Sequence, residues 1–528
     1  MRSNAESFFC FWVSLILLVS GCKSPSQEKP VTLTATETNI GTQPVSTVLA
    51  PTTSTSESQS EGQSLALLPA DRAGLASFPD LTHYTIDVAI DEASTGFTGH
   101  ALVELTNITG QPQDSLYFRL LPNAGQSYGN GSLTVTQTRI GGQPAVTSLS
   151  LDDSALQVDL PGSLQPGQRV QVEFDFQGVV PVDFGGDQSP AAYGIYNFSH
   201  GVLALSGWYP ILAIYDEKGW HLDPVSPLGD SVFSQTALYT VKVTVPSDVV
   251  LAATGVEVGR QSAGDVTTHD LVSGPARDFF LAASTDYKVA TQTVGGTRIN
   301  SYYLPGDVSP GAAGLSAAAG ALSVYNRRFG AYPFAELDVV EAPLRNALGV
   351  EYPEIVMIGA SLYEKPDDPS FSVTIAHEVA HQWWYSLVGN DVFAEPWLDE
   401  GLSTYSSGVY SEDALGEGFY QGLVSYWQGR VDKLVEEGKD DLVTADLGHF
   451  ESLGDPGVYG GVVYSKAALF FKALREAIGD KAFFAALQQY AADNEYRVAT
   501  GEELLKTFEK ASGQQLDSLY QEWLYSKK

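Results

Sequence analysis

The pentapeptide His377-Glu378-Val379-Ala380-His381 restricts how this chain can fold more than any other feature. On an α-helix, residues four apart lie on one face about one turn apart, so both imidazoles can point at one ion. Glu378 is displaced around the helix and can lie beside that ion without binding it. The flanking residues support a helix on both sides, because no glycine or proline occurs between His381 and Gly389.

A further carboxylate completes a ligand set. Glu400 follows His381 by nineteen residues, early in a second helix that Pro396 is expected to begin. Two histidines and one glutamate leave the fourth tetrahedral position open for water, which is typical of a catalytic zinc ion. The sequence therefore predicts one zinc ion per chain, bound by His377, His381 and Glu400, with Glu378 as the general base of a hydrolase.

Length and charge exclude other classes of protein. The 528 residues are enough for two or three domains with large cores. A net charge of −34 argues against nucleic-acid binding, which needs basic grooves. The two cysteines are not expected to form a disulfide, so stability must come from the cores.

The N-terminus has the features of a bacterial lipoprotein precursor. The apolar run 8–19 has 12 residues, fewer than the about 20 that span a bilayer. It fits a signal-peptide core, so residues 1–21 are expected to be removed. Val19-Ser20-Gly21-Cys22 resembles a lipobox, which predicts a lipid on Cys22 that anchors the protein to the cell membrane or envelope, outside the cytoplasm. An ordinary signal with an incidental cysteine is the alternative.

The remaining chain divides into three parts. Residues 22–78 are rich in Ser, Thr, Pro, Gln and Glu, which predicts a disordered tether. Residues 79–287 are expected to form an all-β domain, because apolar and polar residues alternate in the runs 84–90, 101–105, 170–174 and 239–245. Residues 288–528 are expected to be mixed α/β, with helices over 312–329 and 465–478, strands over 337–342 and 355–358, and two more helices at the end.

Residues 80–528 resemble the aminopeptidase N family of zinc metallopeptidases, which are gluzincins. The stretch 377–384 matches the family's H-E-x-x-H-Q-W, and 397–401 matches its W-L-x-E-G at the expected spacing. The resemblance implies a multidomain α+β fold, with an N-terminal β-saddle or sandwich followed by a thermolysin-like catalytic domain. The chain ends before the large C-terminal helical domain that many members carry could follow.

The resemblance extends upstream to the substrate site. The family's G-x-M-E-N or G-G-M-E-Y-P stretch corresponds here to Leu348-Gly349-Val350-Glu351-Tyr352-Pro353. It implies that Glu351 binds the free α-amine of a peptide and that the backbone at Gly349 holds the substrate. The stretch departs from the family pattern at Leu348 and Val350.

A tyrosine pair extends the resemblance downstream. The stretch 459–467 is similar to the family's tyrosines before a Y-x-K-G helix, with Ala467 in place of the glycine. It implies that Tyr464 donates a hydrogen bond to the developing oxyanion and that Tyr459 is the earlier, substrate-binding member. The family's β-domain stretch with a Gln or Glu that helps hold the amine has no match, and 207–210 and 220–224 are candidates to line the cleft.

Together these features favour a zinc-dependent aminopeptidase that acts on peptides. Two alternatives stay open. One is a peptidase with broader or internal cleavage in an open cleft. The other is a surface binding lipoprotein whose zinc site is vestigial, although an intact Glu378 and Tyr464 argue against it. The oligomeric state is not predicted.

Overall fold

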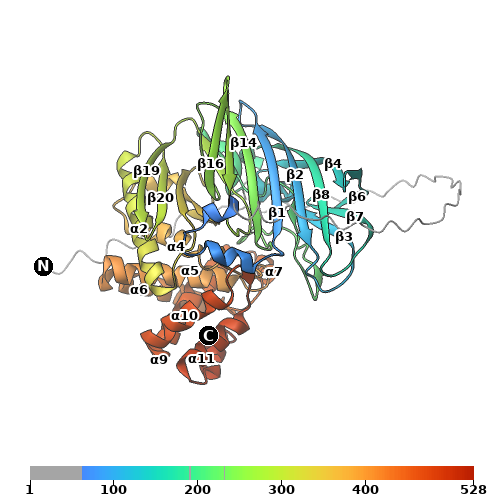
Figure 1. Cartoon of the computed structure of the whole chain (residues 1–528). Coiled ribbons are helices and arrows are strands. Elements are labelled where there is room, and N and C mark those ends of the chain that lie inside the picture. The colour runs from blue at the N-terminus through green and yellow to red at the C-terminus, as the bar shows by residue number, and fades with distance from the viewer. Residues whose placement is uncertain (1–61, 189–191, 231) are drawn as a thin grey trace.

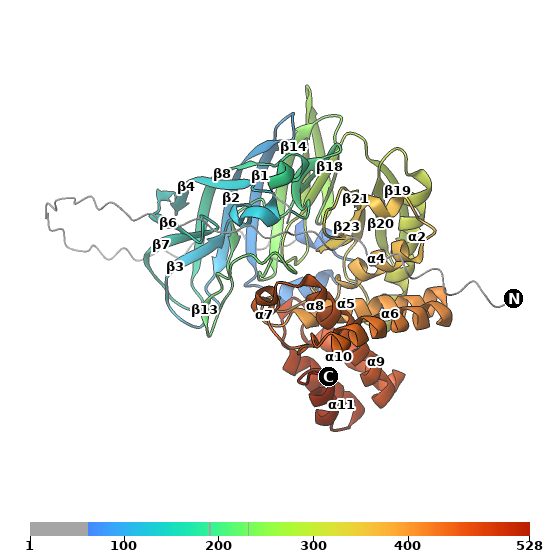
Figure 2. The same cartoon turned by 180° about the vertical axis from the view of Figure 1, so that it is seen from behind.

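The computed structural model describes residues 62–188, 192–230 and 232–528. In Figure 1 the β-sheets of the first half, coloured blue to green, stand above the orange and red helices of the C-terminal half, and Figure 2 shows the same arrangement from behind. No helix within the described ranges is long and apolar enough to cross a lipid bilayer. The predicted signal peptide and Cys22 lie outside the described residues.

An eight-stranded sheet organises the β domain. Its strands, in spatial order, are β16 Val256–Ala263, β17 Val266–Val272, β14 Ala237–Pro246, β1 Thr82–Ile90, β2 Gly96–Thr106, β8 Arg169–Val179, β4 Ser132–Ile140 and β5 Gln143–Pro144. The four alternating runs predicted from the sequence lie in β1, β2, β8 and β14. Along β1 and β14, buried apolar side chains alternate with more exposed residues, as a sheet covered on one face requires.

Two four-stranded sheets complete this domain. One contains β15 Val250–Ala253, β18 Leu281–Ser284, β10 Val202–Leu205 and β9 Tyr196–Ser199, and the other contains β11 Ile211–Leu212, β3 Gln113–Arg119, β7 Ala155–Leu164 and β6 Thr147–Ser150. Trp208 and Tyr209 are fully buried in the core of this domain. The expectation that residues 207–210 line the cleft is wrong, because the Trp208 indole donates to the backbone of Phe279 inside the domain.

The segment preceding β1 is folded. Residues 64–66 and 72–77 form the short helical turns η1 Ser64–Ala66 and η2 Arg72–Ser77. Leu67 and Leu75 are buried in the core of the C-terminal α/β domain, and Leu67 pairs with Phe334. The tether predicted for residues 22–78 is therefore too long at its C-terminal end. The few apolar residues of this segment are buried in a core that distant parts of the chain form.

The C-terminal α/β domain begins with a five-stranded sheet. Its spatial order is β19 Lys288–Val294, β20 Thr297–Tyr303, β21 Glu336–Ala342, β23 Ile355–Gly359 and β22 Gly349–Tyr352. The helices α2 Val308–Arg328, α4 Pro369–Ala380 and α5 Pro396–Tyr410 pack next to one another beside this sheet. β22 is an edge strand and α4 contacts it, so one edge of the sheet faces the helix that carries His377.

Helices fill the rest of the domain. They are α6 Glu417–Glu436, α7 Leu447–Leu453, α8 Pro456–Tyr459, the π-helical turn η7 Gly460–Lys466, α9 Ala467–Ile478, α10 Asp480–Asp493, α11 Gly501–Ser512 and α12 Asp517–Trp523. Three helices rather than the predicted two follow α9. The fold is thus an N-terminal β-sheet domain followed by a mixed α/β domain, as predicted.

Candidate active site

The helix α4 carries His377, and His381 is the residue that caps its C-terminus. Asp368 caps its N-terminus by accepting from the backbone of Ser370 at 2.9 Å. The helix ends at Ala380, earlier than the sequence pattern suggests. The side chain of Gln382 donates to Tyr352 O at 2.9 Å and accepts from the backbone N–H of Glu354, so the chain turns towards the β22–β23 hairpin instead of continuing the helix.

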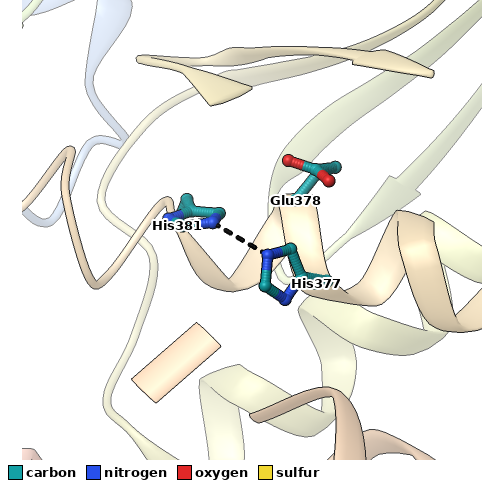
Figure 3. A group of neighbouring side chains, drawn as sticks. All are labelled: His377, Glu378 and His381. Atoms are coloured by element: carbon teal, nitrogen blue, oxygen red, sulfur yellow. Dashed lines mark hydrogen bonds between the residues drawn. The ribbon is translucent and has the colours of Figure 1, made fainter. Parts of the chain in front are cut away.

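Three predicted ligand atoms converge between α4 and α5. Figure 3 shows the His377 and His381 rings pointing towards each other, with their Nε2 atoms 3.2 Å apart. Glu400 Oε2 lies 3.2 Å from His377 Nε2 and 3.6 Å from His381 Nε2. Ligand atoms at zinc bonding distance in a tetrahedron lie about 3.3 Å from one another. This donor set therefore fits one zinc ion.

Asp399 orients one of these histidines. Its Oδ1 lies 2.6 Å from His381 Nδ1, and each side chain is 1% exposed. Burial opposes the charged form of His381, but Asp399 raises the pKa of the imidazole to about 10. A carboxylate on the second ring nitrogen fixes the tautomer that leaves Nε2 free for a metal. The sequence analysis did not assign Asp399 a role, although its position next to Glu400 was a usable signal.

Glu378 lies beside the same histidines. One of its oxygens and one nitrogen of each ring all lie within 4.8 Å of one another. Burial raises the pKa of Glu378 to about 7, while His377 and His381 act in the opposite direction. Gly349 allows this position, because a Cβ on that residue would stand 2.3 Å from Glu378 Oε1.

The two predicted tyrosines lie against the ligand set. The Tyr464 hydroxyl donates to Glu400 Oε1, and its ring stacks on His377 with centroids 6.0 Å apart and 20° between the planes. Tyr459 packs edge-on against Tyr464, 5.7 Å between centroids. A Cβ on Gly229 of the β domain would stand 2.7 Å from the Tyr459 hydroxyl, so this tyrosine contacts the other domain.

Glu351 lies in a cluster of carboxylates. It is 7% exposed, its Oε1 lies 3.6 Å from His381 Nδ1, and that oxygen has no hydrogen-bond partner among the described residues. Burial raises its pKa well above the usual range, and the charges of Asp230 and Asp399 add to the effect. Glu351, His381 and Asp399 could also hold an ion, but the 2.6 Å contact of His381 with Asp399 is a hydrogen bond and too short for two ligands of one metal.

Asp230 joins this cluster from the β domain and was missed by the sequence analysis. Its carboxyl group lies beside those of Glu351 and Asp399, and burial together with the charge of Glu400 raises its pKa. The loop that contains Asp230 is held in place at Pro227, because the Tyr193 hydroxyl donates to Pro227 O at 2.6 Å. The structure thus brings all predicted site residues among the described ones together and adds Asp230 and Asp399.

Comparison with known proteins supports this arrangement. Residues 314–523 match the Peptidase family M1 domain. Aminopeptidase N of Streptomyces lividans is 29% identical over 206 residues, 37% of this chain and 23% of that protein. Aminopeptidase M1-C of rice is 25% identical over 401 residues, 72% of this chain and 43% of that protein. The chain therefore spans less than half the length of these curated relatives.

The fold also has close structural counterparts. An M1 zinc metallopeptidase from Deinococcus radiodurans superposes with a TM-score of 0.66 at 21% identity, covering 85% of this chain and 94% of that one. A variant of it, described as bound to a Tyr-Ser-Ala substrate, superposes with a TM-score of 0.63 at 20% identity, covering 85% and 95%. At this identity the likeness concerns the fold. Residues 314–523 are therefore similar to the M1 family of zinc metallopeptidases, and the residues of the zinc-site motif lie within this matched range.

Proposed function

We propose that the protein is a zinc-dependent aminopeptidase that releases N-terminal residues from peptides. The observation that carries this proposal is the buried, unpartnered carboxylate oxygen of Glu351 beside the zinc ligands. A buried carboxylate needs a positive partner, and the ammonium of a free peptide N-terminus supplies one. The aminopeptidase names of the M1 relatives from rice and Streptomyces lividans are consistent with this activity.

Each side chain of the site has a proposed task. A zinc ion held by His377, His381 and Glu400 supplies Lewis acidity towards water and the scissile carbonyl. Glu378 takes a proton from the attacking water and returns it to the leaving amine. Tyr464 donates a hydrogen bond to the oxygen on which negative charge develops, so it stabilises the transition state more than the bound substrate.

The β domain contributes to the proposed amine site. Asp230 contacts Glu351, so an ammonium between them could donate to both carboxylates. The backbone of β22 at Gly349 is proposed to hold the peptide, because this strand has a free edge next to α4. Tyr459 is proposed to line the site between Tyr464 and the Gly229 loop.

Matched free and N-acetylated peptides test the proposal. Cleavage of the free peptides alone, one residue at a time from the N-terminus, is the expected result. Cleavage of both would replace it with a broader peptidase, and cleavage of neither by zinc-loaded protein would support a binding protein with a vestigial site. One zinc ion per chain is proposed from the single ligand set, and elemental analysis of the purified protein measures it.

We also propose that the protein is lipid-anchored outside the cytoplasm through Cys22. The support is the apolar run 8–19 followed by Val19-Ser20-Gly21-Cys22. Expression in a bacterial host with labelled fatty acid should label the wild type and place it in the membrane fraction. Cys22→Ser should lose both label and membrane association, whereas an unlabelled wild type would contradict the anchor.

A further inference from the structure

Lys466 forms a buried ion pair that the proposed chemistry does not use. Its side chain is 0% exposed and that of Asp440 is 1% exposed. The ammonium donates to both Asp440 oxygens at 2.8 Å, to Asp441 O at 2.8 Å and to Ser526 O at 3.0 Å. Burial lowers the pKa of Lys466, and Asp440 counteracts it. Because desolvation offsets much of the attraction in such a pair, stability alone is a weak reason for its presence.

The pair lies at the end of the turn that carries Tyr464. Lys466 is the last residue of η7, a π-helical turn that begins at Gly460, directly after Tyr459. A π-turn holds one more residue than an α-helical turn, and successive helical residues are rotated by about 100°. A change of register in η7 would therefore move the Tyr464 hydroxyl away from Glu400, to which it donates.

Several contacts hold this turn in place. Asp440 follows α6, and η7 lies directly on that helix, since a Cβ on Gly461 would stand 2.5 Å from Leu434 Cδ1. The backbone N–H of Lys528 donates to Asp440 Oδ2 at 2.6 Å, and Lys527 Nζ lies 2.7 Å from Asp441 Oδ1. These contacts close the pair off from water, so Lys466 and Asp440 tie the end of η7 to α6.

We propose that Lys466 and Asp440 are a positioning pair that sets the register of η7 and so aims the Tyr464 hydroxyl at the zinc site. This inference rests on the proposed role of Tyr464 in the peptidase reaction. The pair acts through Tyr464 and touches no substrate. It should therefore affect kcat and leave KM and zinc binding nearly unchanged.

A double-mutant cycle on the full, zinc-loaded protein tests the pair. Lys466→Met with Asp440→Leu removes both charges together, which avoids leaving one of them buried and unpaired. The matched control is Lys472→Met with Glu476→Leu, which removes a Lys–Glu contact of 2.7 Å at the surface of α9. Each double substitution is made in the wild type and in Tyr464→Phe, and kcat, KM, zinc content and thermal unfolding are measured with an aminoacyl-anilide substrate.

The expected result is a loss in kcat of about tenfold or more when the buried pair is removed from the wild type, with zinc content and KM retained. In the Tyr464→Phe background the same substitutions should change kcat by less than about twofold, because the group they position is absent. Equal losses in both backgrounds, or an unchanged kcat in the wild type, would overturn the proposal. Full activity of Tyr464→Phe alone would instead contradict the proposed role of Tyr464, on which the inference depends.

Discussion

The substitution Asp230→Asn is expected to weaken substrate binding and to increase the stability of the substrate-free protein. Asp230 contacts Glu351 and Asp399 and adds negative charge to a cluster that already includes Glu378 and Glu400. Asparagine has nearly the same shape and removes only the charge. The substitution should weaken binding of a substrate ammonium, and it should stabilise the substrate-free protein by relieving repulsion between carboxylates.

The size of both effects can be estimated. An ammonium about 4 Å from a carboxylate gains about 4 kcal/mol at an effective dielectric constant of about 20. Glu351 remains in the variant and asparagine can still accept a hydrogen bond, so a loss of about 1.4–2.7 kcal/mol is expected, equivalent to about 10- to 100-fold in KM. Relief of repulsion should raise the free energy of unfolding by about 1 kcal/mol.

The assay compares free-amine peptides with des-amino analogues of the same sequence. Asp230→Asn should raise KM for the free peptides, leave kcat within about threefold, and leave any slow cleavage of the analogues unchanged. Glu217→Gln is the matched control, because Glu217 is an exposed acid of the same β-domain segment. A KM within about threefold of the wild type for Asp230→Asn, with zinc retained, would refute the placement of the ammonium at Asp230.

Three further predictions concern the zinc site and the oxyanion. His381→Ala should lose most of its zinc, measured by elemental analysis, and a full equivalent would contradict the ligand assignment. Asp399→Leu should weaken zinc binding by about 10- to 100-fold, because His381 Nδ1 loses its 2.6 Å partner, and chelator competition measures it. Tyr464→Phe should lower kcat by about 100-fold with little change in KM, and an unchanged kcat would exclude its hydroxyl from the reaction.

The sequence predicted the zinc site because its residues are close along the chain. His377 and His381 are related by one helical turn, and Glu400 follows on the next long helix, so local spacing is enough to bring them together. Asp230 could not be found in this way. It lies in a loop with no periodic pattern and reaches Glu351 only through the packing of the β domain on the C-terminal α/β domain.

The parts of the fold that were predicted wrongly also depend on contacts between residues that are distant in the sequence. The strands β1, β2, β8 and β14 alternate clearly and were predicted, whereas Leu67 and Leu75 are isolated apolar residues at the end of a polar stretch. Their burial depends on a core formed by residues more than 200 positions away, such as Phe334. The early end of α4 likewise depends on Gln382 bonding to the β22–β23 hairpin, which no local pattern reveals.

Glu378→Gln tests the central claim most directly, because it keeps the shape of the site and removes only the proposed general base. The variant should bind as much zinc as the wild type and should lose at least about 100-fold in kcat on peptides with a free N-terminus. Undiminished turnover by the zinc-loaded variant would contradict the assignment of Glu378, and with it the proposed mechanism.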